Sequence, residues 1–216
     1  TNMDKAIEKV IMIAKNEIGY LEKKSNSQLD DKTANAGSAN YTKYWRDVKP
    51  SWNGDYWCAV FIAWCFMKAF GLEIAKKLLK HWPYVYCPDM KKYFTLNANP
   101  KVGDIVIFWS NSKKEFVHTG LVTAVIGDRF YTIEGNTSGA SAVIANAKSY
   151  LNSQLPGTKF CTPDYSIVNG TNITAGETKT DNNLVTGGKY MFAPETVQLG
   201  SKGTSVLLLQ EILIAR

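Results

Sequence analysis

The sequence contains few histidines and cysteines, and their scarcity limits the chemistry open to it. Two histidines occur in 216 residues, His81 and His118, so the candidates for a general base are few. The four cysteines include no CxxC pair and lack the density of a disulfide-stapled secreted domain. We therefore expect free thiols at all four positions, which are Cys58, Cys65, Cys87 and Cys161.

Long charged runs and long apolar runs are also missing. No run of Lys or Arg exceeds two residues, although the formal net charge is +6 and the sequence pI is near 9.0. This pattern argues against nucleic acid as a partner, while the net charge favours polyanions such as an anionic membrane surface or a phosphate-rich cell wall, and charge alone does not choose between them. Charged residues such as Lys5, Glu8 and Lys9 interrupt the apolar stretches near the N-terminus. We therefore expect no signal peptide, no membrane insertion and synthesis in a cytoplasm.

Apolar periodicity predicts helices in the first half of the chain and strands in the second. Residues 57–70 are apolar on nearly every side, which is typical of a buried helix at the axis of the core. An amphipathic helix begins near Asp4, and a long loop at 24–50 packs by its aromatic residues. Shorter helices are predicted at 73–80 and 88–94, a β-meander at 104–109, 118–125 and 129–134, and further short strands between 142 and 165.

Cys58 is predicted to lie where a helix begins, a position that favours a reactive thiolate. We expect Asp55 to cap a helix that starts near Tyr56. Cys58 then lies in the first turn, beside unpaired N–H groups and the positive end of the helix dipole. The alternative is that Cys58 is one more small buried residue. Cys65 lies deep in the same helix, and we interpret it as a packing residue.

His118 is the better candidate for the base. It opens an apolar strand, whereas His81 lies in a connector near a proline and is interpreted as a surface or packing residue. Glu134 and Asn136 are two residues apart in the next strand and so point to the same face. Either side chain can then orient the imidazole through Nδ1. The alternative is that the segment EGNTSG is only a polar turn.

The motifs WCAVFIAWCF, PKVGDIVIF, VHTGLV and IEGNTSG follow one another in a familiar order. They resemble the cysteine- and histidine-dependent amidohydrolase/peptidase family, abbreviated CHAP, over residues 1–166. The resemblance implies a papain-like α+β fold, with N-terminal helices packed on a small antiparallel β-sheet, and hydrolysis of bacterial peptidoglycan. It implies Cys58 as nucleophile, His118 as base, Glu134 as the group that orients the base, and Asn136 as a fourth polar residue. Related NlpC-type peptidases tend to use a second histidine where Glu134 stands.

The C-terminal part of the sequence resembles a second module. Residues 167–195 are rich in Gly, Thr and Asn, which predicts a flexible linker. Residues 196–216 resemble the first helix of a type 1 peptidoglycan-binding domain. This layout is that of phage or prophage endolysins of Gram-positive hosts, which implies synthesis in the host cytoplasm and action at the cell wall after release. We expect a monomer that binds peptidoglycan and anionic wall polymers.

The sequence leaves several alternatives open. An N-acetylmuramoyl-L-alanine amidase and a stem or crossbridge endopeptidase would use the same thiol chemistry. A wall-binding protein without activity and an intracellular small-molecule amidase are further alternatives. Trp57 and Trp109 are candidates for stacking on substrate, with core packing as the alternative. We expect no metal and no cofactor, because the aspartates before Cys58 lack the ligand spacing of a calcium loop.

Overall fold

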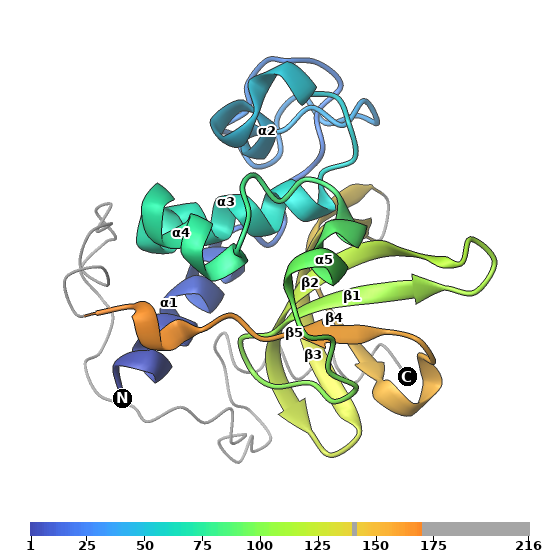
Figure 1. Cartoon of the computed structure of the whole chain (residues 1–216). Coiled ribbons are helices and arrows are strands. Elements are labelled where there is room, and N and C mark those ends of the chain that lie inside the picture. Colours follow the sequence, from blue (N-terminus) through green and yellow to red (C-terminus); the bar gives the residue numbers. More distant parts are fainter. Residues whose placement is uncertain (140–141, 170–216) are drawn as a thin grey trace, which may run out of the picture. The chain divides into compact units, whose positions relative to one another are not determined.

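The computed structural model describes residues 1–139 and 142–169 (Figure 1). Within them, helices come first and an antiparallel sheet follows, which confirms the predicted α+β class. The predicted wall-binding fragment at 196–216 lies outside the described residues, as does the predicted linker apart from 167–169. The domain boundary at residue 166 therefore stays a prediction.

The helices follow the predicted order. α1 (Asn2–Asn16) begins with a capping box formed by Thr1 and Asp4. α3 (Cys58–Phe70) is buried on nearly all sides, as its uniform apolarity predicts. None of the described helices is long and apolar enough to cross a membrane. The other helices in the described residues are α2 (Lys43–Val48), α4 (Leu72–Leu79), α5 (Met90–Tyr93) and the 3₁₀ segments η1 (Pro50–Trp52), η2 (Cys87–Asp89), η3 (Asn152–Gln154) and η4 (Tyr165–Ile167).

The start of α3 differs from the prediction. The helix begins at Cys58 rather than near Tyr56, and its N-cap is Trp57, with no capping hydrogen bond from a side chain. Asp55 does not cap it, because its backbone N–H donates to the carbonyl of Trp52 and its own carbonyl accepts from the indole of Trp45. These bonds hold Asp55 in the preceding turn, so the N–H groups at the start of α3 have no side-chain cap.

The segment 24–50 is only partly a loop. Thr42 caps α2 by accepting a hydrogen bond from the backbone N–H of Trp45, and the short helix buries Tyr44 and Trp45. The predicted packing by aromatic residues is therefore confirmed, but two of these residues pack from a helix. The Tyr44 ring stacks on Trp57, the residue just before Cys58, with ring centroids 5.5 Å apart.

The sheet has five strands in the order β4-β3-β2-β1-β5. The predicted meander is confirmed, and β4 extends it by a fourth strand that is longer than expected, at nine residues. β5 pairs with the free edge of β1. The strands are β1 (Ile105–Ser110), β2 (Glu115–Ile126), β3 (Arg129–Ser138), β4 (Val143–Leu151) and β5 (Lys159–Cys161).

α3 packs directly on β2 and β3, and the helices lie to one side of the sheet (Figure 1). Helices packed on a small antiparallel sheet are what the resemblance implies. Apolar residues of both layers, among them Phe61, Leu121 and Ile133, form the core between them. The opposite face of the sheet buries a second cluster, made of Val106, Phe108, Val122, Phe130 and Phe160.

Gly135 lets α3 approach the sheet closely. A Cβ atom at this position would lie 2.5 Å from Cβ of Phe61, closer than real Cβ atoms come to a neighbour. Phe61 lies about one helical turn after Cys58. The glycine of the motif IEGNTSG therefore sets how near the N-terminal end of α3 comes to β3.

Candidate active site

Cys58 is the first residue of α3, and the residue is buried, with 8% of its surface exposed. No side chain caps this end of the helix, and Cys58 lies beside its backbone N–H groups and the positive end of its dipole. The backbone N–H of Ala59 hydrogen-bonds to the Cys58 sulfur. The predicted position in the first helical turn is confirmed, although the predicted cap is wrong.

His118 lies in β2, opposite Phe108 of β1. The strand begins three residues earlier than predicted, at Glu115, so His118 is inside the strand rather than at its start. The register shifts beside this pair, because Val117 is an extra residue on β2. Such a bulge bends a strand and re-aims the neighbouring side chain. The His118 ring stacks on Phe108 with centroids 5.6 Å apart, and its side chain keeps 23% exposure.

Glu134 lies on β3 and holds the His118 ring. Its Oε1 lies 2.8 Å from Nε2 of His118, and its side chain has no solvent exposure. Three hydroxyls donate to the carboxylate: Thr132 at 2.5 Å, Tyr150 at 2.8 Å and Thr137 at 3.3 Å. The prediction that Glu134 orients the base is supported by this geometry. The predicted ring nitrogen is wrong, because Glu134 contacts Nε2 rather than Nδ1.

Asn136 does not share the face of Glu134. The register between β3 and β4 shifts between Glu134 and Thr137, so one extra residue stands between them. Asn136 also has a left-handed backbone, with φ of 52°. Because of this bulge, Thr137 takes the place that Asn136 would have on a regular strand, and it is Thr137 that donates to Glu134. The two-residue spacing behind the prediction does not hold, and a role for Asn136 beside the site stays a prediction.

The surroundings of Cys58 and His118 favour a thiolate beside an imidazolium. The hydrogen bond from Cys87 is the largest cause that lowers the pKa of Cys58. Burial raises this pKa, while the hydrogen bond and charge of His118 lower it further, and the result is a pKa of about 5. Burial alone would lower the pKa of His118, but hydrogen bonds with Cys58 and Glu134 and the charges of both raise it to about 10. At neutral pH the sulfur is therefore a thiolate and the ring an imidazolium.

Cys87 is a further site residue that sequence reasoning missed, besides the three hydroxyl residues that donate to Glu134. Its Sγ lies 3.4 Å from Sγ of Cys58, although 29 positions separate the two residues. The hydrogen bond with Cys58, burial and the charge of Cys58 raise the pKa of Cys87 well above its usual value. Cys87 therefore keeps its proton and donates it to the thiolate. Nothing in the segment YVYCPDM indicates which other cysteine it meets.

The remaining cysteines have no such partner among the described residues. Cys65 is fully buried inside α3, which confirms its interpretation as a packing residue, and burial raises the pKa of its thiol. Cys161 lies at the end of β5, where burial raises the pKa of its thiol to about 12. All four cysteines are free, as predicted.

His81 and Trp57 are structural. His81 stacks on Tyr93 with ring centroids 4.4 Å apart, and its Nδ1 lies 2.7 Å from the carbonyl of Leu79. The prediction that Trp57 stacks on substrate is wrong, because its side chain is fully buried and its indole N–H donates to Glu22 at 3.1 Å. Trp109 is partly exposed next to the Phe108–His118 pair, so its contact with substrate stays a prediction.

Gly120 leaves the space that Glu134 occupies. A Cβ atom at Gly120 would lie 2.7 Å from Cγ of Glu134. The glycine in the motif VHTGLV therefore allows the buried carboxylate to reach His118 from the neighbouring strand.

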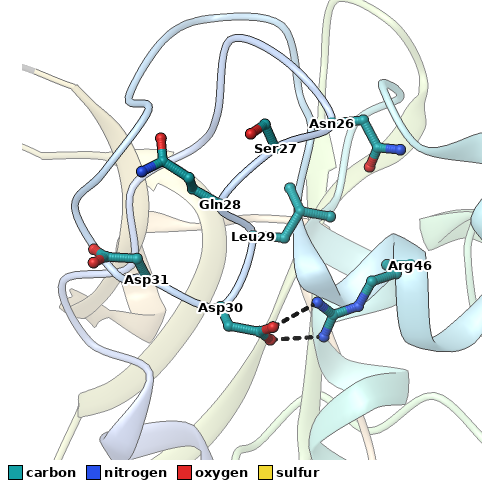
Figure 2. A pocket seen from close by; sticks show the side chains of 7 residues that line it. All are labelled: Asn26, Ser27, Gln28, Leu29, Asp30, Asp31 and Arg46. Atoms are coloured by element: carbon teal, nitrogen blue, oxygen red, sulfur yellow. Dashed lines mark hydrogen bonds and ion pairs between the residues drawn. The ribbon is translucent and has the colours of Figure 1, made fainter.

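A surface pocket of about 450 Å³ lies away from this constellation (Figure 2). Its walls are residues 26–31 and Arg46, and none of them belongs to the Cys58 site. Asp30 forms a bidentate ion pair with Arg46 there, while Asp31 accepts hydrogen bonds from the backbone of residues 33 and 34. Within the described ranges, no group of three or more His, Cys, Asp or Glu side chains is arranged to hold a metal ion.

Part of the chain matches a known protein family. Residues 50–136 match the family model described as the CHAP domain. No curated protein matches the chain.

Three solved structures show distant likeness. Ly7917 is 14% identical with a TM-score of 0.41, over 76% of this chain and 63% of that chain. The structure of Ly7917 with the hydrolysing product of MDP is 13% identical with a TM-score of 0.42, over 73% and 63%. A lipoprotein-like protein of the NLP/P60 family from Staphylococcus aureus is 17% identical with a TM-score of 0.37, over 72% and 41%. The chain spans less than two-thirds of the length of each.

The segment that matches the family model includes Cys58, His118 and Glu134. The structure brings the same three residues together from α3, β2 and β3. Residues 50–136, the segment of the chain that matches the CHAP domain, therefore contain this constellation.

Proposed function

We propose that this protein hydrolyses amide bonds of bacterial peptidoglycan, with Cys58 as nucleophile and His118 as acid and base. One observation supports the proposal above all. A thiolate at the start of α3 pairs with an imidazolium whose Nε2 lies 2.8 Å from a fully buried carboxylate. The match to the CHAP domain supports a peptidoglycan hydrolase of the amidase or peptidase class.

The reaction begins from the ion pair. The Cys58 thiolate attacks the carbonyl carbon of the amide, and the carbonyl oxygen takes the negative charge. The backbone N–H groups at the uncapped start of α3 are the proposed donors to this oxygen. The imidazolium of His118 then protonates the leaving amine as the C–N bond breaks, which leaves a thioester on Cys58 and a neutral ring.

Water completes the cycle. Neutral His118 accepts a proton from a water molecule as the water oxygen attacks the thioester carbon. The C–S bond breaks, the acid product leaves, and the thiolate–imidazolium pair is restored. Glu134 holds the ring in one orientation throughout, because its Oε1 accepts from Nε2. Burial and the charge of Glu134 raise the pKa of Tyr150, so this hydroxyl stays protonated and keeps donating to the carboxylate.

The bond and the biological setting are finer proposals. Amidase cleavage at the muramic acid link and endopeptidase cleavage within the stem or crossbridge both fit the thiol mechanism. The resemblance of residues 196–216 to a wall-binding module supports a role as an endolysin, which is made in the host cytoplasm and acts at the wall after release. The net charge of +6 supports contact with anionic wall polymers.

The test compares Cys58→Ala with Cys65→Ala on purified peptidoglycan. Both changes remove a buried thiol from α3, but only Cys58 pairs with His118. We expect Cys58→Ala to release no new amino groups and Cys65→Ala to keep most activity. Mass spectrometry of the released fragments identifies the bond.

Three results would contradict the proposal. Release of amino groups by Cys58→Ala would exclude Cys58 as nucleophile. Binding of the wild-type chain to walls with no cleavage would favour a non-catalytic binding protein, and cleavage of soluble amides alone would favour a small-molecule amidase.

A further inference from the structure

The hydrolytic reaction does not require a second thiol, such as Cys87, in contact with Cys58. Hydrolysis uses one sulfur as nucleophile, and a hydrogen-bond donor beside it does not need to be a thiol. A hydroxyl would donate a stronger hydrogen bond than S–H does. The two sulfurs nevertheless lie 3.4 Å apart in a buried site. A second thiol at this place can do what a hydroxyl cannot, which is to form a covalent bond with the first.

We propose that Cys58 and Cys87 form a site of reversible oxidation, in which a hydroperoxide oxidises Cys58 and Cys87 closes a disulfide with it. The proposal rests on the proposed function in one respect, since the sulfur that would attack the amide is also the sulfur that reacts with the peroxide. The consequence is a hydrolase that oxidation switches off and a thiol reductant switches on again.

The chemistry balances in two steps. First, the Cys58 thiolate attacks one oxygen of hydrogen peroxide, the O–O bond breaks, and Cys58 sulfenic acid and hydroxide form. Second, the Cys87 sulfur attacks the sulfenic sulfur, the S–O bond breaks, and the proton of Cys87 leaves with the hydroxyl group as water. The two thiols lose two electrons in total, and the peroxide gains them.

The geometry favours the second step. A disulfide needs an S–S distance of about 2.05 Å, so the sulfurs must approach by roughly 1.4 Å from their separation of 3.4 Å. Cys58 is the first residue of α3 and Cys87 the first residue of η2. Because each residue is the first of its helix, no preceding helical turn restricts its χ1, and rotation about χ1 can supply part of this approach.

The charges favour the same order of events. Cys58 is the reactive thiolate, because its pKa is lowered, whereas burial keeps Cys65 and Cys161 protonated by raising the pKa of each. The charge of Cys58 is one cause of the raised pKa of Cys87. A sulfenic acid at Cys58 is neutral, so the first step removes that charge and eases the loss of the proton from Cys87.

The first experiment treats the purified full-length chain with hydrogen peroxide and counts thiols under denaturing conditions. We expect the count to fall from the four free thiols to two, with a loss in mass of two hydrogens. Peptide mapping without reductant should join the peptides of Cys58 and Cys87. A chain that gains oxygen at Cys58 and forms no such link would overturn the proposal. This readout needs no peptidoglycan, so it is independent of whether the chain proves to be a hydrolase.

The second experiment compares Cys87→Ser with the double variant Cys65→Ser/Cys161→Ser. After peroxide and then dithiothreitol, activity is expressed as a fraction of each variant's own starting value. We expect near-complete recovery in the wild type and the double variant, and little recovery in Cys87→Ser, whose Cys58 should gain two oxygen atoms. Equal recovery in Cys87→Ser would overturn the proposal. Circular dichroism before treatment verifies that each variant is folded.

Discussion

Removal of the Cys87 thiol tests how the Cys58 thiolate is stabilised. The hydrogen bond across 3.4 Å is the largest cause of the lowered pKa of Cys58. A hydrogen bond to a charged group contributes about 1.5–3 kcal/mol, and the lower end applies because S–H is a weak donor. Since one pKa unit corresponds to about 1.4 kcal/mol, Cys87→Ala should raise the pKa of Cys58 by about one unit.

The rate of alkylation by iodoacetamide as a function of pH measures this shift. At pH 5 about half of Cys58 is thiolate in the wild type, and about a tenth would be in Cys87→Ala, so alkylation should slow roughly fivefold. At pH 8 both are almost fully ionised and the rates should agree. Cys87→Ser keeps a donor and should restore most of the reactivity at pH 5. Superimposable pH profiles for wild type and Cys87→Ala would refute the reasoning.

Three further predictions concern the same site. The rate of peptidoglycan cleavage should rise with pH near 5, as Cys58 ionises, and fall near 10, as His118 loses its proton. A pH–rate profile centred on the ordinary pKa of a free thiol would contradict the thiolate–imidazolium pair. Glu134→Gln should lower kcat by roughly 10²-fold and move the alkaline limb of the pH–rate profile to lower pH, because the carboxylate charge helps to hold the proton on His118. An alkaline limb that does not move would exclude this role of Glu134. Gly120→Ala should displace the Glu134 side chain, which costs roughly 1–3 kcal/mol of stability by overpacking. The variant should still melt cooperatively but have a lower kcat. Unchanged activity would show that the carboxylate has room to move.

The candidate catalytic residues were predictable where the local sequence pattern fixes their place. Cys58 follows turn residues at the start of an apolar run, and His118 and Glu134 lie on consecutive strands. A meander puts such strands side by side, so a contact between them follows from chain order. The contact of Thr132 with Glu134 was also predictable, because Thr132 lies two residues before Glu134 on the same strand.

Irregularities of the backbone explain the errors. Asn136 was expected beside Glu134 from strict alternation, but a bulge inserts one residue there and Thr137 takes the position. Trp57 is the N-cap of α3, and its buried indole N–H donates to Glu22. No spacing in the sequence indicates this contact. A bulge or a turn of this kind depends on tertiary packing as much as on local sequence.

Contacts between distant segments were out of reach. Cys87 meets Cys58 across 29 positions, through a connector and a short 3₁₀ segment that carry no periodic pattern. Tyr150 reaches Glu134 from β4, whose pairing register with β3 depends on that same bulge. The structure therefore brings together the three central residues of the predicted site, and the prediction lacked the groups that support them.

The central claim is that the Cys58 sulfur attacks the amide carbon and carries the acyl group. Mass spectrometry of the chain, quenched with acid during turnover of purified peptidoglycan, tests it most directly. We predict a peptidoglycan fragment bound as a thioester to the peptide that contains Cys58, and its absence from Cys58→Ala. Cleavage that proceeds with no adduct on Cys58, and at an equal rate in Cys58→Ala, would contradict the account.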